Sequence, residues 1–167
     1  MLLEEQRKAE SCLAKEEKKD PERERIHRFV QACGLRRGAL ARLRVEDIQQ
    51  YEDGSIWISV NDPDDVPIYE IPVLRGQERV VLSAIAGRDP EELIFPHLPR
   101  SLSLQPLRIQ YARALYHHVL AHNELGYGEE QVVRYVLHAL CLEERHMDLV
   151  RDYFLGLGPE RTSKKNR

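Results

Sequence analysis

Apolar residues recur along this chain at two different spacings. Between Ile26 and Cys33 they fall three or four positions apart, which is the period of one buried helix face. Asp20 and Pro21 precede this stretch and are typical of a helix start, whereas Gly34 behind it is typical of a helix end. The pattern therefore predicts a helix that starts at Asp20-Pro21 and stops at Gly34.

The middle of the chain has the alternating pattern of β-strands. A short helix carrying Leu40 and Leu43 comes first, and apolar positions then alternate with others from Ile56 to Val60. A cluster of Asn, Asp and Pro predicts a turn, after which Ile68 to Val73 forms the returning strand. These strands predict a small antiparallel sheet, followed by a helix from Gln77 to Ala86.

The last third returns to helical spacing. Apolar stripes predict three helices, with inward-facing residues Leu107, Tyr111, Leu115 and Val119 in the first, Val132 to Leu140 in the second, and Met147, Val150 and Phe154 in the last. The predicted fold class is α+β and mostly α. We expect one domain over residues 21–157, between a charged leader at 1–20 and a basic tail at 158–167.

Composition narrows the class of protein without defining a function. The 167 residues are 42% hydrophobic and 32% charged, and no apolar run is long enough to span a membrane. The three cysteines lie far apart, so we expect reduced thiols in a cytoplasmic protein with no metal or cofactor. The formal charge of -3 argues against a dedicated DNA-binding protein, because such proteins are usually basic.

The stretch from Gly34 to Ile48, GLRRGALARLRVEDI, carries more specific information. It resembles the first conserved motif of the tyrosine recombinases (phage integrases), which reads roughly G-L-R-x-x-E-L-x-x-L-x-W-x-D-I. In that family the arginine after Gly-Leu binds the scissile phosphate, so the resemblance gives this role to Arg36. Ala39 stands where the family has its glutamate.

Two later stretches are similar to the other motifs of the family. The second motif, H-x-L-R-H-x-x-A, matches QPLRIQYA, in which Arg108 takes the place of the second phosphate-binding arginine and Gln105 that of the first histidine. The third motif, A-L-G-H, matches ALCL, so that Cys141 stands for the glycine and Leu142 for the histidine. Tyr153 then falls at the position of the nucleophilic tyrosine.

The resemblance also shows which catalytic groups are missing. The family lysine belongs in the hairpin turn, where this chain has Asn61 to Asp65, with Asp62 at the family position and no basic residue from Tyr51 to Glu70. An alternative register would place Arg75 to Arg79 on that motif. Strand exchange needs a tyrosine nucleophile, arginines that stabilise the phosphate charge, and proton donors. Arg36, Arg108 and Tyr153 could fill the first two roles, whereas the proton donors have no obvious counterpart.

Each candidate residue also has an ordinary structural explanation. Arg36 and Arg108 could form ion pairs or bind helix ends, and Tyr153 could be an amphipathic packing residue. His138 and His146 are the neighbouring histidines that could substitute for the lost ones. His117 and His118 are adjacent on a helix and lack the spacing of a metal pair.

Three functions remain open at this point. The first is a recombinase-like protein of a mobile element that binds DNA weakly, or regulates, and has lost catalysis. The second is an active minimal recombinase that uses Tyr153. The third is an interaction module that pairs with itself or with an intact integrase, through Phe154, Leu155 and Leu157. The first two require Arg36, Arg37, Arg42, Arg44 and Arg108 to gather on one face.

Overall fold

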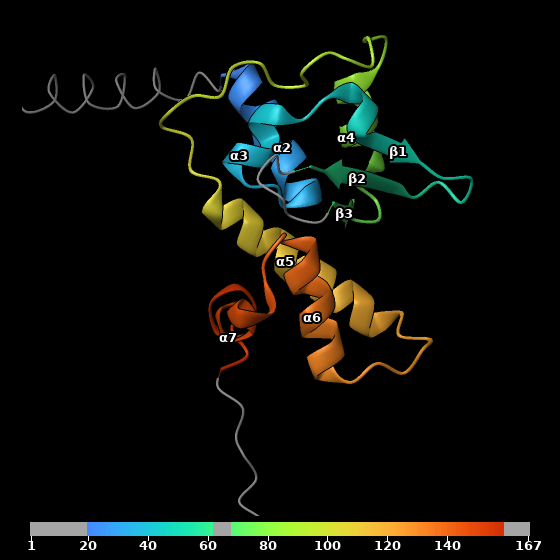
Figure 1. The fold of residues 1–167 in the computed structure, drawn as a ribbon, viewed down its shortest axis with the longest axis vertical. Helices are drawn as coiled ribbons and strands as arrows, with labels where there is room; N and C mark the ends of the chain where they lie inside the picture. Colours follow the sequence, from blue (N-terminus) through green and yellow to red (C-terminus); the bar gives the residue numbers. More distant parts are fainter. Residues whose placement is uncertain (1–19, 62–67, 159–167) are drawn as a thin grey trace, which may run out of the picture.

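A computed structural model describes residues 20–61 and 68–158 (Figure 1). Its first half contains α2 (Pro21–Cys33), α3 (Arg37–Arg42), the 3-10 turn η1 (Val45–Asp47), strands β1 (Ile48–Gln50), β2 (Ile56–Val60) and β3 (Tyr69–Pro72), and α4 (Glu78–Ile85). Its second half contains α5 (Gln105–Ala121), α6 (Glu129–Ala139), the 3-10 turn η2 (Glu144–His146), α7 (Met147–Leu149) and the π-helical turn η3 (Val150–Phe154). The predicted α+β, mostly α class is confirmed.

The sheet has one strand more than the sequence predicts. The three strands are antiparallel in the order β1-β2-β3, with Ile58 of β2 opposite both Ile48 and Ile71. The strand β1 is only three residues long and two of them are glutamines, so it carries no alternation from which a strand could be predicted. Alternate residues of β2 are buried, in agreement with its pattern.

Helix α2 begins and ends where its sequence signals lie. The side chain of Asp20 accepts a hydrogen bond from the backbone N–H of Glu22, at 3.1 Å. At the other end Gly34 has a φ of 66° and donates its N–H to the carbonyl of Val30 at 2.7 Å. Helix α2 contacts both α4 and α5, and its buried face, which includes Phe29, belongs to the main core. The end of α2 is therefore fixed inside the molecule.

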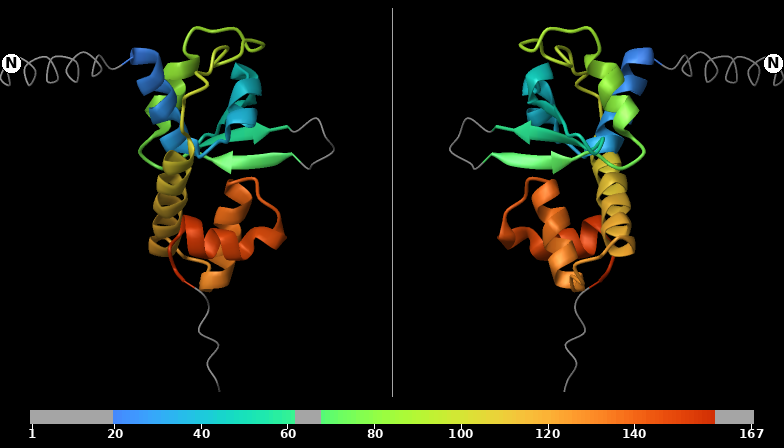
Figure 2. Two further views of the ribbon diagram at one scale, coloured as in Figure 1. Left: turned by 90° about the vertical axis from the view of Figure 1, so that its left-hand side faces the viewer. Right: turned by 90° about the vertical axis from the view of Figure 1, so that its right-hand side faces the viewer.

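Helix α5 joins the two halves of the fold. It runs beside α2 at one end, and towards its other end it is covered by α6 and the C-terminal turns (Figure 2). The phenol of Tyr111, fully buried on α5, donates a hydrogen bond to the carbonyl of Pro72 in β3 at 2.7 Å. One helix thus reaches α2, the sheet and the C-terminal segment.

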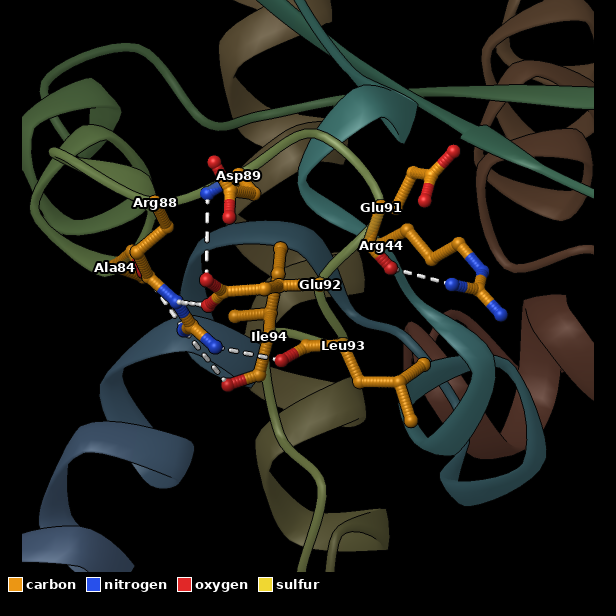
Figure 3. Close-up of polar contacts among 8 residues, drawn as sticks. All are labelled: Arg44, Ala84, Arg88, Asp89, Glu91, Glu92, Leu93 and Ile94. Carbon is orange, nitrogen blue, oxygen red and sulfur yellow. Dashed lines mark hydrogen bonds and ion pairs between the residues drawn. The ribbon is translucent and has the colours of Figure 1, made fainter.

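Arginine side chains hold the loop that follows α4 (Figure 3). Arg88 pairs with Glu92 at 2.9 Å and donates to the carbonyls of Ala84, Leu93 and Ile94. Arg44 donates to the carbonyl of Glu91 in the same loop. These guanidinium groups donate hydrogen bonds to backbone oxygens at the end of α4 and in the loop, so they stabilise the fold.

The C-terminal segment corrects one sequence-based expectation. Phe154 and Leu155 are buried in this chain's own core. The prediction that they contribute to a docking surface is therefore wrong. Leu157 is 39% exposed, and Leu149 and Tyr153 are exposed nearby in sequence. Except for Asp20 and Gly158, the predicted leader and tail lie outside the described residues. No helix among the described residues has the length and apolarity needed to cross a membrane.

Candidate functional site

Arg108 occupies the junction between α2, α6 and the C-terminal turn. Its Nε donates to the carbonyl of Gly34 at 3.0 Å, and one Nη donates to the carbonyl of Leu140 at 3.1 Å. Both oxygens belong to C-cap residues, where helix carbonyls lack partners inside the helix. For these two hydrogen bonds, Arg108 therefore acts as an arginine that binds helix ends, which is the structural explanation considered above.

The arginine also lies over an aromatic ring of the last turn. The guanidinium carbon is 5.6 Å from the centroid of the Phe154 ring, which is a cation–π contact. Phe154 is held in turn by Arg113, whose Nε donates to the Phe154 carbonyl at 2.9 Å. No sequence pattern indicates the Arg113 contact, because it joins a side chain to a distant backbone oxygen. The two carbonyls and the Phe154 ring thus orient the guanidinium group of Arg108.

Arg36 lies near enough to Arg108 for its charge to act on the Arg108 pKa, although the two residues are far apart in the sequence. Arg36 is the exposed N-cap residue of α3, two positions after the glycine that Arg108 binds. The pKa of Arg108 is lowered first by burial and also by the positive charge of Arg36, and both arginines lower the pKa of Cys141. We call these two side chains the two-arginine site.

The turn after α6 contains a left-handed residue, Cys141. Cys141 has a φ of 56°, and among the described residues it is the one non-glycine residue with a positive φ. Its N–H binds the carbonyl of His138 at 3.0 Å, and the N–H of Leu142 binds that of Leu137 at 3.1 Å. This is the helix-ending motif that normally uses glycine. The sequence resemblance places the family glycine at Cys141.

The thiol of Cys141 is not a reactive group at neutral pH. Burial raises its pKa to about 11, although Arg36 and Arg108 act in the opposite direction. Burial raises the pKa of Cys33 to about 12, and Cys33 lies close enough to Cys141 to be affected by it. Both thiols are therefore protonated, and neither supplies a thiolate nucleophile. Among the described residues, no three His, Cys, Asp or Glu side chains come close enough together to hold a metal ion.

Tyr153 lies beside the residue that supports Arg108. Its ring meets the Phe154 ring edge to face, with centroids 5.5 Å apart, and the side chain is 50% exposed. Its interpretation as a packing residue is only half correct, because the side chain also reaches solvent. The π-helical turn at Val150–Phe154 sets this arrangement, with Phe154 inward and Tyr153 outward.

Within residues 20–61 and 68–158, the remaining family positions carry glutamine and leucine, whose side chains cannot transfer a proton. Gln105 is the first residue of α5, and Leu142 is a half-buried apolar residue after the α6 turn. Asp62 lies outside the described residues. Of the two substitutes, His138 is exposed and lies 3.7 Å from Glu144, with which it would pair if protonated. His146 is half-buried, and its Nδ1 is buried without a hydrogen-bond partner among the described residues.

The other arginines of the first motif do not all gather with Arg36. Arg37 donates to the carbonyls of Pro99 and Leu102, at 3.0 and 2.6 Å, and so holds the segment that leads into α5. Arg44 is occupied by the loop in Figure 3. Arg42 lines a separate cleft together with Glu46 and Asp47. The five arginines expected on one basic face therefore do not form it together, because Arg37 and Arg44 bind backbone carbonyls elsewhere.

Comparisons with known proteins add no independent support for a family. The sequence matches no family model and no curated protein.

Proposed function

We propose that this chain is a tyrosine-recombinase-like DNA-binding domain that holds one backbone phosphate between Arg36 and Arg108 and does not cleave DNA. The observation that carries the proposal is that Arg108 binds the carbonyl of Gly34, two residues before Arg36, at 3.0 Å. These two arginines are also the pair that the sequence resemblance assigns to phosphate binding. The left-handed turn at Cys141, at the position of the family glycine, is a second and independent point of agreement.

The arrangement suits binding of a phosphate. A guanidinium has five N–H donors, and Arg108 uses two of them on the carbonyls of Gly34 and Leu140. Because these bonds and the Phe154 ring orient the group, its other donors are held in place before a ligand arrives. Arg36 is exposed beside it and supplies a second positive charge.

The same surroundings argue against cleavage. Glutamine and leucine occupy the positions that the resemblance assigns to histidines, and neither can transfer a proton. His138 is exposed and faces Glu144. Each lost general acid or base typically costs a factor of about 10² to 10⁴ in rate, so joint loss leaves negligible turnover.

DNA binding is expected to be weak, strongly dependent on salt and sensitive to Arg36. The acidic chain repels DNA, and few phosphates can be contacted, so the affinity should fall as salt rises. Arg36→Gln should weaken binding about tenfold at low salt, the effect of one charge-assisted contact. Fluorescence anisotropy with a labelled duplex over a salt series measures this.

Arg145→Gln is the matched control for that experiment. Arg145 is exposed and pairs with Glu143 at 2.8 Å in the turn after α6, so its replacement removes the same charge elsewhere. If Arg36→Gln and Arg145→Gln weaken DNA binding equally, the two-arginine site is not the binding site.

No covalent protein–DNA adduct is expected on a nicked suicide duplex. Tyr153 is accessible, so burial of the nucleophile would not explain a failure to react. The assay compares the unchanged chain with Tyr153→Phe on denaturing gels. An adduct that forms with the unchanged chain and is lost in Tyr153→Phe would establish the active minimal recombinase instead.

An interaction module is the second candidate function. Leu149, Tyr153 and Leu157 are 44%, 50% and 39% exposed, and all three belong to the C-terminal segment. Exposed apolar side chains near one another in sequence favour a protein partner, either a second copy of this chain or an intact integrase. Self-association that is lost in Leu149→Lys, together with no salt-dependent DNA binding, would favour this candidate over the first.

A further inference from the structure

A second group of arginines surrounds a cleft between α2 and α4. The cleft has a volume of about 240 Å³ and is lined by Arg25 and Arg28 of α2 and by Arg79 of α4, with Val80, Ser83, Ala84 and Phe95 completing its wall. The two helices stand side by side in both views of Figure 2 and contact each other directly. None of these arginines belongs to the two-arginine site.

The backbone fixes where these positive charges lie. Arg25 and Arg28 are three positions apart on α2, so they project from the same helix face. Arg79 is in the first turn of α4, on the other side of the cleft. Phe95, at the base, is 5% exposed and packs edge to face against Phe29 of α2, with ring centroids 5.0 Å apart. The floor of the cleft is thus part of the core.

Two of the three arginines of the cleft, Arg25 and Arg79, form no salt bridge among the described residues. Arg28 pairs with Glu24, one turn earlier on α2 at 2.8 Å, and its side chain is 65% exposed. Exposed pairs of this kind contribute little, so an incoming anion can compete for Arg28. The neighbouring Arg88 is different, because backbone carbonyls and Glu92 already occupy it (Figure 3).

We propose that the cleft lined by Arg25, Arg28 and Arg79 binds a phosphoryl oxyanion. Three guanidinium groups match the several oxygens and the multiple charge of a phosphate better than the single charge of a carboxylate. Liquid water occupies about 30 Å³ per molecule, so the cleft also has room for part of the group that carries the phosphate. The apolar wall of Val80, Ala84 and Phe95 suits such a group.

The source of the phosphate is a soluble phosphate ester or the backbone of a nucleic acid. The cleft lies on the α4 side of α2, and Arg108 reaches α2 from α5, so the proposal does not depend on the two-arginine site. The chain as a whole is negatively charged, so generic attraction of anions does not account for binding here.

Titration with inorganic phosphate at constant ionic strength, followed through the arginine Nε–H resonances, tests this proposal. We expect the resonances of Arg25, Arg28 and Arg79 to shift along one saturation curve. Arg79→Gln should weaken this binding about tenfold, as should Arg25→Gln, whereas Arg145→Gln should leave it unchanged. Arg36→Gln should also leave the phosphate saturation curve of the cleft arginines unchanged. This result would distinguish the cleft from the proposed DNA contact at Arg36.

A short duplex and a nucleoside monophosphate then identify the source. If the duplex shifts the cleft resonances at lower concentration than the monophosphate, the ligand is a nucleic-acid backbone, and the reverse order indicates a soluble ester. Absence of cleft shifts with all three probes would overturn the proposal. So would equal phosphate binding by Arg79→Gln and Arg145→Gln.

Discussion

Gly34→Ala is expected to destabilise the chain by about 2–5 kcal/mol, because two costs add at one position. Gly34 has a φ of +66°, where a side chain is strained, and an added Cβ would lie 2.2 Å from Cδ1 of Tyr111. Tyr111 cannot move away easily, since it is fully buried and hydrogen-bonded to Pro72. Urea unfolding followed by circular dichroism measures the loss.

Gly54→Ala separates the two costs. Gly54 has a φ of +81°, but nothing lies within 4 Å of the Cβ that would be added there. This variant keeps the backbone strain without the collision, so it should lose only about 1–2 kcal/mol. Equal losses in Gly34→Ala and Gly54→Ala would show that the close packing of Tyr111 on the end of α2 contributes nothing.

Arg108→Met is expected to cost about 2–4 kcal/mol of stability and also to weaken DNA binding. The substitution leaves the carbonyls of Gly34 and Leu140 without their donor and removes the cation–π contact with Phe154. Methionine resembles the aliphatic part of arginine in length, so the loss reports on the polar contacts rather than on a large cavity. Chemical unfolding gives the stability, and duplex titration under native conditions gives the binding.

Two further variants make the Arg108 result interpretable. Arg108→Lys keeps the charge but cannot place two N–H groups in the same fork, so it should recover only part of the stability. Arg36→Gln changes an exposed side chain and should leave stability within about 0.5 kcal/mol while weakening DNA binding. Unchanged stability in Arg108→Met would mean that this arginine is not the structural link between α2 and α6.

Local signals in the sequence are enough to define several elements of the fold. Asp20, Pro21 and Gly34 set the ends of α2 because capping uses atoms within one turn. The alternation at Ile56 to Val60 predicts β2, because one face of a strand is buried as a unit. The sequence of β1 has no such alternation. It becomes a strand because its backbone pairs with that of β2.

The roles of the arginines, by contrast, follow from long-range packing. In the sequence the arginines of the first motif are alike, and only the resemblance distinguishes Arg36. The fold directs Arg37 and Arg44 to backbone carbonyls of distant loops, and it places Arg36 near enough to Arg108 for its charge to act on the Arg108 pKa. It also buries Phe154 while leaving Tyr153 exposed, and it forms an arginine cleft from α2 and α4. These outcomes depend on contacts between residues remote in the chain, which no local pattern encodes.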